Sequence, residues 1–165
     1  MTSNGEFERI LEQNERFAEA FDRSSLTAAP LTGLAILTCM DARIDVEDAL
    51  GLRVGDAHII RNAAGLASED AIRSLVVSQQ LLGTREILVI AHTGCGLHGA
   101  SETDLRQRVE LTTGSTSQMG FGAFMDLDTM VREQVEILLD DPAILEVPIH
   151  GLVYEVETGR LRQVV

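Results

Sequence analysis

Apolar residues recur with the period of a helix near the start of the chain. Residues 5–22 set Phe7, Ile10, Leu11, Phe17, Ala18 and Phe21 among Glu, Gln and Arg. This spacing predicts an amphipathic helix. Ser24, Ser25 and Pro30 then mark a connection. We therefore expect a helical arm over residues 1–30 ahead of the main body of the chain.

Three short apolar runs follow the arm, at residues 34–38, 57–60 and 87–91. Uninterrupted runs of this length are typical of strands that are buried on both faces of a parallel sheet. Between the second and third runs, apolar residues at helical spacing predict a helix over residues 68–82. Ser68 is its expected N-cap and Gly83 its expected end.

The second half of the chain continues the alternation of strands and helices. Residues 101–111 and 126–140 predict helices, and the Gly- and Ser-rich stretch 112–124 predicts a loop. Residues 149–156 and 160–165, joined by a turn at 157–159, predict a hairpin. We expect one α/β domain over residues 1–165, with a mainly parallel central sheet of about four strands, flanking helices and a C-terminal antiparallel edge strand.

Composition narrows the classes of partner. With 26 acidic and 13 basic residues, the chain has a net charge of −13. This argues against nucleic acid and against an anionic membrane, because both are bound by basic patches. No apolar run approaches the roughly 18 residues that span a bilayer. Residues 1–6 lack the features of a signal peptide, so a cytoplasmic location is the expectation.

The two cysteines lie at the ends of predicted strands. Cys39 directly follows the run 34–38, and His92 directly follows the run 87–91, with Cys95 three residues further on. Sites in parallel sheets form at the carboxyl ends of strands, and paired strands lie roughly 4.8 Å apart. If the first and third runs are neighbours, these side chains face one point. Two thiolates and an imidazole suit Zn²⁺, and three ligands with an open position is the catalytic pattern; two unrelated buried thiols are the alternative.

Asp41 and Arg43 follow Cys39 at alternate positions. In an extended or tightly turning segment such residues point the same way, so Asp41 can face the metal and Arg43 can face Asp41. We expect an inactive state in which Asp41 is a fourth zinc ligand, and an active state in which Arg43 holds Asp41 as an acceptor for bound hydroxide. The inactive state should gain as pH falls. An ordinary surface ion pair is the alternative.

These motifs resemble those of the β-class carbonic anhydrases. Cys39-Met-Asp-Ala-Arg43 and His92-Thr-Gly-Cys95 match the Cys-x-Asp-x-Arg and His-x-x-Cys motifs of that family, and Arg61-Asn-Ala-Ala-Gly65 is similar to its Arg-Asn-x-Ala-Gly turn. The likeness covers about residues 33–100 and continues more weakly to the C-terminal strands. It is strongest to a compact subgroup that includes carbonyl sulfide and carbon disulfide hydrolases.

The resemblance implies zinc bound by Cys39, His92 and Cys95, with Asp41 and Arg43 as the catalytic dyad. It also implies a homodimer or homotetramer, because the family builds its active site near a subunit interface. Two departures, Gly94 where many members have Asp and Pro30 near the position of a substrate-contacting Gln in plant-type members, leave the substrate open.

The leading functional hypothesis is zinc-dependent hydration of CO2 to bicarbonate, in which zinc lowers the pKa of bound water and the resulting hydroxide attacks the carbon. The same hydroxide can attack carbonyl sulfide or carbon disulfide and release hydrogen sulfide. A hypothesis from another class is a structural or redox-sensing zinc protein without activity, in which Asp41 is a permanent fourth ligand.

Three other side chains have two interpretations each. Phe121 and Phe124 are candidates for setting the width of the pocket, although phenylalanines more often lie in a core. His98 is a candidate proton shuttle because its ordinary pKa is near neutral, although a lone His in a glycine-rich turn is more often a surface residue. We expect His58 and His150 to be hydrogen-bonded core residues.

Overall fold

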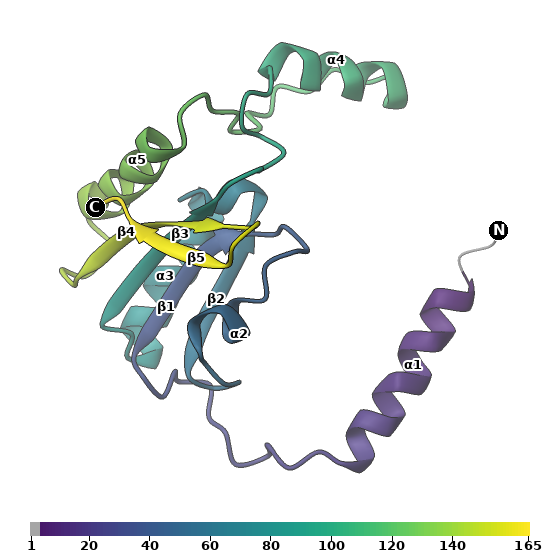
Figure 1. The fold of residues 1–165 in the computed structure, drawn as a ribbon, viewed down its shortest axis with the longest axis vertical. Coiled ribbons are helices and arrows are strands. Elements are labelled where there is room, and N and C mark those ends of the chain that lie inside the picture. Colours follow the sequence, from purple (N-terminus) through teal and green to yellow (C-terminus); the bar gives the residue numbers. More distant parts are fainter. Residues whose placement is uncertain (1–3) are drawn as a thin grey trace.

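One five-stranded sheet organises the computed structural model, which describes residues 4–165. Its strands are β1 (Leu34–Cys39), β2 (Ala57–Asn62), β3 (Glu86–His92), β4 (Ile149–Glu155) and β5 (Arg160–Gln163). They lie in the order β2-β1-β3-β4-β5 (Figure 1). β1 pairs in parallel with β2 and β3, β3 pairs in parallel with β4, and β5 is antiparallel to β4. The predicted fold class, including the antiparallel C-terminal edge, is confirmed.

Five α-helices are present in the described part of the chain. They are α1 (Asn4–Glu19), α2 (Val46–Leu50), α3 (Glu69–Leu82), α4 (Glu102–Thr113) and α5 (Leu127–Asp140). Ser68 caps α3 by accepting from the Ala71 N–H, and Gly83 ends that helix in the left-handed conformation, as predicted. The sequence reasoning missed α2. Its five residues are too few to show a helical period, although Asp45 caps its N-terminus.

The two faces of the sheet carry separate apolar cores. On one face, alternate residues of β1 and β3 pack with α3 and α5 in a cluster that includes Ala35, Leu37, Leu75, Val89 and Leu138. The other face carries the residues between them in the sequence, in a cluster that includes Ile36, Val46 and Ile90. Cys39 and Cys95 belong to this second cluster. Both cysteines therefore pack against the apolar core on that side.

The helix α1 extends away from the sheet (Figure 1). Its predicted apolar face is exposed rather than packed on the core; Phe7 is 63% exposed and Phe17 is 52% exposed. The domain arrangement, with an arm over residues 1–30, stays a prediction, and residues 1–3 lie outside the described part. α4 likewise has no buried residue.

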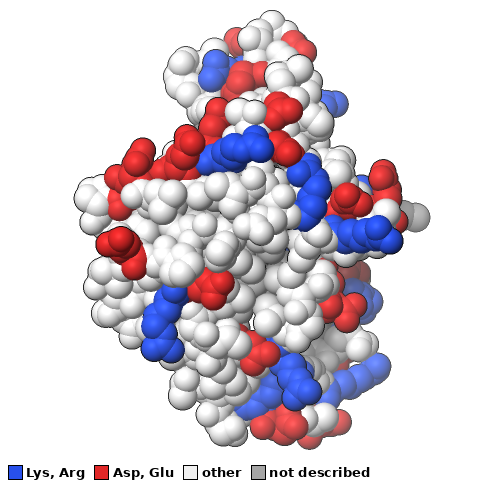
Figure 2. All heavy atoms as spheres, turned by 60° about the vertical axis from the view of Figure 1, so that its left-hand side comes forward, with Lys and Arg blue, Asp and Glu red and all other residues white. Residues whose placement is uncertain are grey.

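Two expectations from the sequence concern a membrane-spanning segment and a basic surface patch. Among residues 4–165, no helix is long and apolar enough to cross a membrane. On the face shown in Figure 2, acidic and Arg side chains are interspersed around a broad uncharged area. That face carries no continuous basic stripe, in keeping with the net charge of −13.

Candidate metal centre

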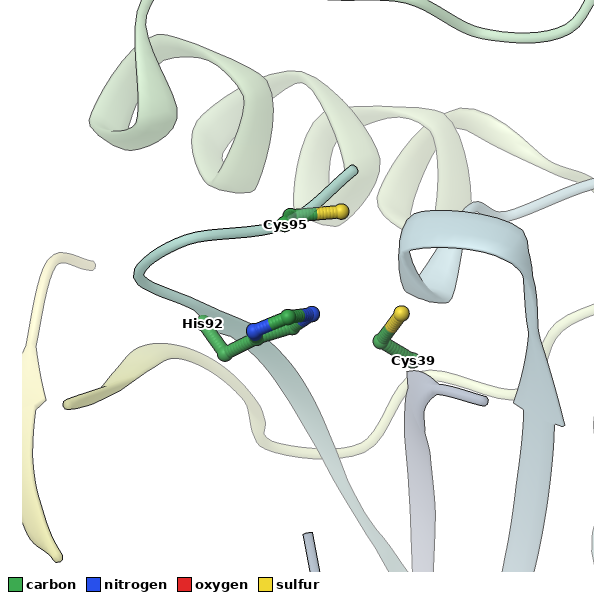
Figure 3. Close-up of side chains that lie close together, drawn as sticks. All are labelled: Cys39, His92 and Cys95. Carbon is green, nitrogen blue, oxygen red and sulfur yellow. The ribbon is translucent and has the colours of Figure 1, made fainter. Parts of the chain in front are cut away.

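Three side chains converge where β1 and β3 end. The two strands are hydrogen-bonded neighbours, with Thr38 opposite Ile90. Cys39 is the last residue of β1 and His92 the last of β3. Cys95 follows in a turn, and the ligand atoms of Cys39, His92 and Cys95 lie within 4.8 Å of one another (Figure 3). The convergence expected from the sequence is therefore present.

The imidazole of His92 is oriented for metal binding. Its Nδ1 lies 2.9 Å from the carbonyl oxygen of Thr93, so that Nδ1–H can donate to this oxygen. Such a bond leaves the lone pair on Nε2. Nε2 is buried and has no hydrogen-bond partner among the described residues. A buried, unpartnered nitrogen beside two sulfurs fits a metal ion, since zinc ligands about 2.3 Å from a tetrahedral ion lie about 3.8 Å apart.

The three groups shift one another's pKa values. Burial raises the pKa of the Cys39 thiol, but the neighbouring His92 and the backbone N–H groups of Asp41 and Ala64 lower it to about 7. Burial lowers the pKa of His92, but Cys39, the Thr93 backbone and Asp41 together raise it above its ordinary value. Burial raises the pKa of Cys95. A divalent cation would replace the shared protons, since metal ligands must be deprotonated.

Asp41 lies beside this cluster and is held by Arg43. The Arg43 backbone N–H and its Nε both donate to Oδ1 at 2.9 Å, and Nη2 donates to Oδ2 at 2.8 Å. Arg43 Nη2 also donates to the Gly94 carbonyl at 3.0 Å. The Arg43 hydrogen bonds hold the pKa of Asp41 well below its usual range. Asp41 Oδ2 is 3.8 Å from His92 Nε2, so an ionised acceptor faces the metal side of the site.

The end of β2 and the turn after it fix the loop that carries Asp41, a role that the sequence reasoning did not assign. Arg61 donates to the carbonyls of Cys39, Asp41 and Ile44 at 2.7–3.0 Å. The Gly65 backbone approaches Thr38 so closely that a Cβ there would lie 3.0 Å from its Cα. The signal that could have found this role is an Arg at the end of a strand whose neighbour ends in a metal ligand.

A pocket of about 460 Å³ opens beside the cluster. Its lining includes Cys39, Asp41 and Cys95, with apolar walls from Met40, Ala63, Ala64, Leu97 and Phe121. Phe121 therefore has the predicted pocket position. Phe124 does not line this pocket; it packs against the core, and its ring stacks on His98 with centroids 5.3 Å apart.

The other histidines lie outside the ligand cluster. His58 is partly buried and hydrogen-bonded, with Nδ1 2.6 Å from Ser78 Oγ and Nε2 2.7 Å from the Ala28 carbonyl, as expected. His150 is not a core residue; its side chain is 40% exposed beside Glu86, because it lies at the start of β4, where the pairing with β3 begins. His98 is exposed and its Nε2 lies 3.1 Å from the Met125 carbonyl. Its role as a proton shuttle stays a prediction.

Several known proteins are similar to this chain in sequence and in fold. A family model described as carbonic anhydrase matches residues 34–119. β-Carbonic anhydrase 1 of Mycobacterium tuberculosis is 36% identical over 155 residues, which cover 93% of this chain and 94% of that protein. Carbon disulfide hydrolase of Saccharolobus solfataricus is 40% identical over 157 residues, 79% of this chain and 76% of that protein. The crystal structure of a carbonic anhydrase from Streptococcus mutans superposes with a TM-score of 0.92 at 39% identity, covering 96% and 97% of the two chains.

Proposed function

This chain belongs to the β-class carbonic anhydrase family of enzymes, and on that premise we propose that it hydrates CO2 to bicarbonate at a zinc ion bound by Cys39, His92 and Cys95. Three protein ligands leave one position of a tetrahedral ion for water or substrate. When bound there, zinc would act as a Lewis acid and lower the pKa of water toward neutrality.

One observation carries the proposal: an ionised acceptor faces the metal side of the cluster and is held there by three hydrogen bonds. Asp41 is paired with Arg43 while its Oδ2 lies 3.8 Å from His92 Nε2. In this arrangement Asp41 can accept a hydrogen bond from the attacking oxygen and orient its lone pair toward the substrate carbon. The bonds from Arg43 oppose rotation of Asp41 toward the metal, and the inactive state with Asp41 as a fourth ligand at low pH stays a prediction. A purely structural site would have no need of a second charged residue to hold this carboxylate.

The pocket walls suit a small, uncharged substrate. Met40, Ala64, Leu97 and Phe121 present apolar groups beside the cluster. Such walls exclude water from the reacting carbon and bind a linear, weakly polar molecule. They offer little to hold an anion, which favours the release of bicarbonate once it forms.

A second activity on the same site is hydrolysis of carbonyl sulfide or carbon disulfide with release of hydrogen sulfide. The carbon disulfide hydrolase that is 40% identical supports this candidate. The apolar walls support it too, because sulfur makes both molecules larger and more polarisable than CO2. The third hypothesis, a zinc protein without activity, loses support from the membership of an enzyme family and from the pairing of Asp41 with Arg43.

The experiment compares all three substrates on one zinc-loaded preparation. CO2 hydration is followed by stopped-flow with a pH indicator, and sulfide release is measured from carbonyl sulfide and carbon disulfide. We expect CO2 hydration to be fastest and to be lost in Asp41→Asn. A matched control is Asp48→Asn, an exposed residue of α2 away from the pocket lining. Zinc-loaded protein without any of the three activities would contradict the proposal.

The exposed face of α1 supports a homodimer or homotetramer. Five apolar side chains are each at least half exposed in one chain: Phe7, Ile10, Leu11 and Phe17 on α1, and Phe21 just after it. Burying five such side chains would contribute about 1.5–3 kcal/mol each, and a second copy of the chain offers a matching surface. Sedimentation should give an assembly larger than one chain, and removal of residues 1–21 should dissociate it; a monomeric full-length chain would contradict this.

The cytoplasmic location expected from the sequence remains a proposal. Cys39 and Cys95 do not form a disulfide, which suits the reducing environment of the cytoplasm. Cell fractionation with a tagged full-length chain would test the location.

A further inference from the structure

The wall of the pocket at Phe121 is tied to a helix by one carboxylate. Glu102, in the first turn of α4, accepts hydrogen bonds from two backbone N–H groups of the loop that carries Phe121. The Phe121 N–H donates to Oε1 at 3.1 Å and to Oε2 at 3.0 Å, and the Ala123 N–H donates to Oε1 at 2.9 Å. These bonds span 19 and 21 residues of sequence. The carboxylate is therefore the direct link between α4 and the pocket wall.

The backbone of the loop is shaped to receive this carboxylate. Gly122, between the two donors, has φ +77°, a conformation that residues with a Cβ rarely adopt. A Cβ at Gly122 would overlap the side chain of Leu66. The loop is thus pressed against Leu66 on one side and bonded to Glu102 on the other. Phe121, next to Gly122 in this loop, lines the pocket with Asp41.

Glu102 is not part of an apolar core. None of the residues of α4 is buried. The loop bonds, with a smaller contribution from Arg106, lower the pKa of the Glu102 carboxyl. Arg106 lies 3.6 Å from its Oε2 and also donates from Nε to the Met119 carbonyl at 3.3 Å. The polar contacts of this helix turn therefore converge on residues 119–123.

We propose that Glu102 is a positioning residue that sets the substrate pocket by fixing Phe121 against it. The inference rests on the proposed function only in taking this pocket as the substrate pocket. Without the carboxylate, two backbone N–H groups lose their acceptor and the loop is free to rotate away from Leu66. Phe121 then leaves the wall, and the pocket widens without any change in Cys39, His92 or Cys95.

A fluorescence experiment tests the position of residue 121 without any assay of activity. The chain has no Trp and one Tyr, so Phe121→Trp introduces a single reporter. We expect its emission to shift to the red when Glu102→Ala is added, because the indole becomes more exposed. Glu102→Gln, which keeps one acceptor oxygen, should restore part of the shift. Glu110→Ala, which removes the same charge from an exposed position of α4, should leave the emission unchanged.

Kinetics then separate positioning from general damage. Glu102→Ala and Phe121→Ala should each raise KM roughly tenfold with kcat nearly unchanged, since each removes apolar binding rather than chemistry. The double variant should be no worse than the poorer single variant, because both act through one group. A merely structural role would lower zinc content and kcat and would add to Phe121→Ala.

Two results would overturn the inference: unchanged Trp emission in the Glu102→Ala background, or additive effects in the double variant. These failures differ from failure of the proposed function. If the zinc-loaded protein lacks all three activities, the function is wrong, while the emission comparison still decides whether Glu102 positions residue 121.

Discussion

Replacing Gly65 with Ala should disturb the metal centre through the backbone alone. Gly65 closes the turn after β2 with φ +72°, and a Cβ there would lie 3.0 Å from both the Cα and the C of Thr38 and 3.2 Å from the N of Cys39. These are backbone atoms of β1 and have no side-chain rotation to relieve the contact. The turn and the end of β1 must therefore move apart, and Cys39 moves with its strand.

The size of the effect follows from two costs. A left-handed conformation costs a residue with a Cβ about 1–2 kcal/mol, and crowding in a packed region costs about 1–3 kcal/mol more. Gly65→Ala should thus lower the free energy of unfolding by about 2–5 kcal/mol in total. Gly83→Ala is the matched control, because Gly83 has φ +78° and no atom within 4 Å of a Cβ. It should show the conformational cost only.

Urea denaturation of both variants, with and without zinc, measures these costs. Zinc affinity should fall about 10- to 100-fold in Gly65→Ala, as expected when a group that orients a ligand is displaced, and should stay unchanged in Gly83→Ala. Equal destabilisation of the two variants, with equal zinc affinity, would refute the claim that this turn positions Cys39.

Three further predictions concern charge and metal. Arg43→Ala should lower kcat/KM for CO2 about 10- to 100-fold with zinc content unchanged, because Asp41 loses its partner; stopped-flow and metal analysis check this, and full activity would contradict it. Chelation of zinc, starting from a free concentration about 100 times its Kd, should lower the melting temperature by roughly 5–10 °C, whereas Cys95→Ser should show no such drop in calorimetry. The hydrogen bond from Arg162 lowers the pKa of Asp128, so this pair should add stability above the unfolded pKa of about 3.9 and lose it as pH falls through the lower folded value. In Asp128→Asn, the free energy of unfolding measured in urea should fall less between about pH 5 and pH 2 than in the unaltered chain. An equal fall would contradict the assignment.

The sheet and the metal cluster could be predicted because short apolar runs mark the strands and the ligands follow those runs directly. Buried strands appear in the sequence as short apolar runs, and the residues after them share one edge of a parallel sheet. Cys39 and His92 stand directly at those ends, so one assumption about strand order was enough to bring them together. Asp41 and Arg43 followed from their alternate spacing.

The remaining features depend on contacts that spacing along the chain does not encode. Arg61 reaches three carbonyls that lie 17–22 residues away in the sequence, and Glu102 bonds backbone groups, which carry no residue signature. The apolar face of α1 predicted a helix correctly but did not reveal that this face is exposed in one chain. Amphipathic spacing shows that a face is apolar and leaves open which surface covers it.

X-ray absorption at the zinc edge, on protein purified with zinc at about pH 8.5, where the thiols can ionise, tests the central claim most directly. We expect one zinc per chain with two sulfur ligands at about 2.3 Å and two nitrogen or oxygen ligands at about 2.0–2.1 Å. One sulfur should disappear in Cys95→Ser. A shell without sulfur, or the same spectrum after either cysteine is replaced, would contradict a centre built from Cys39, His92 and Cys95.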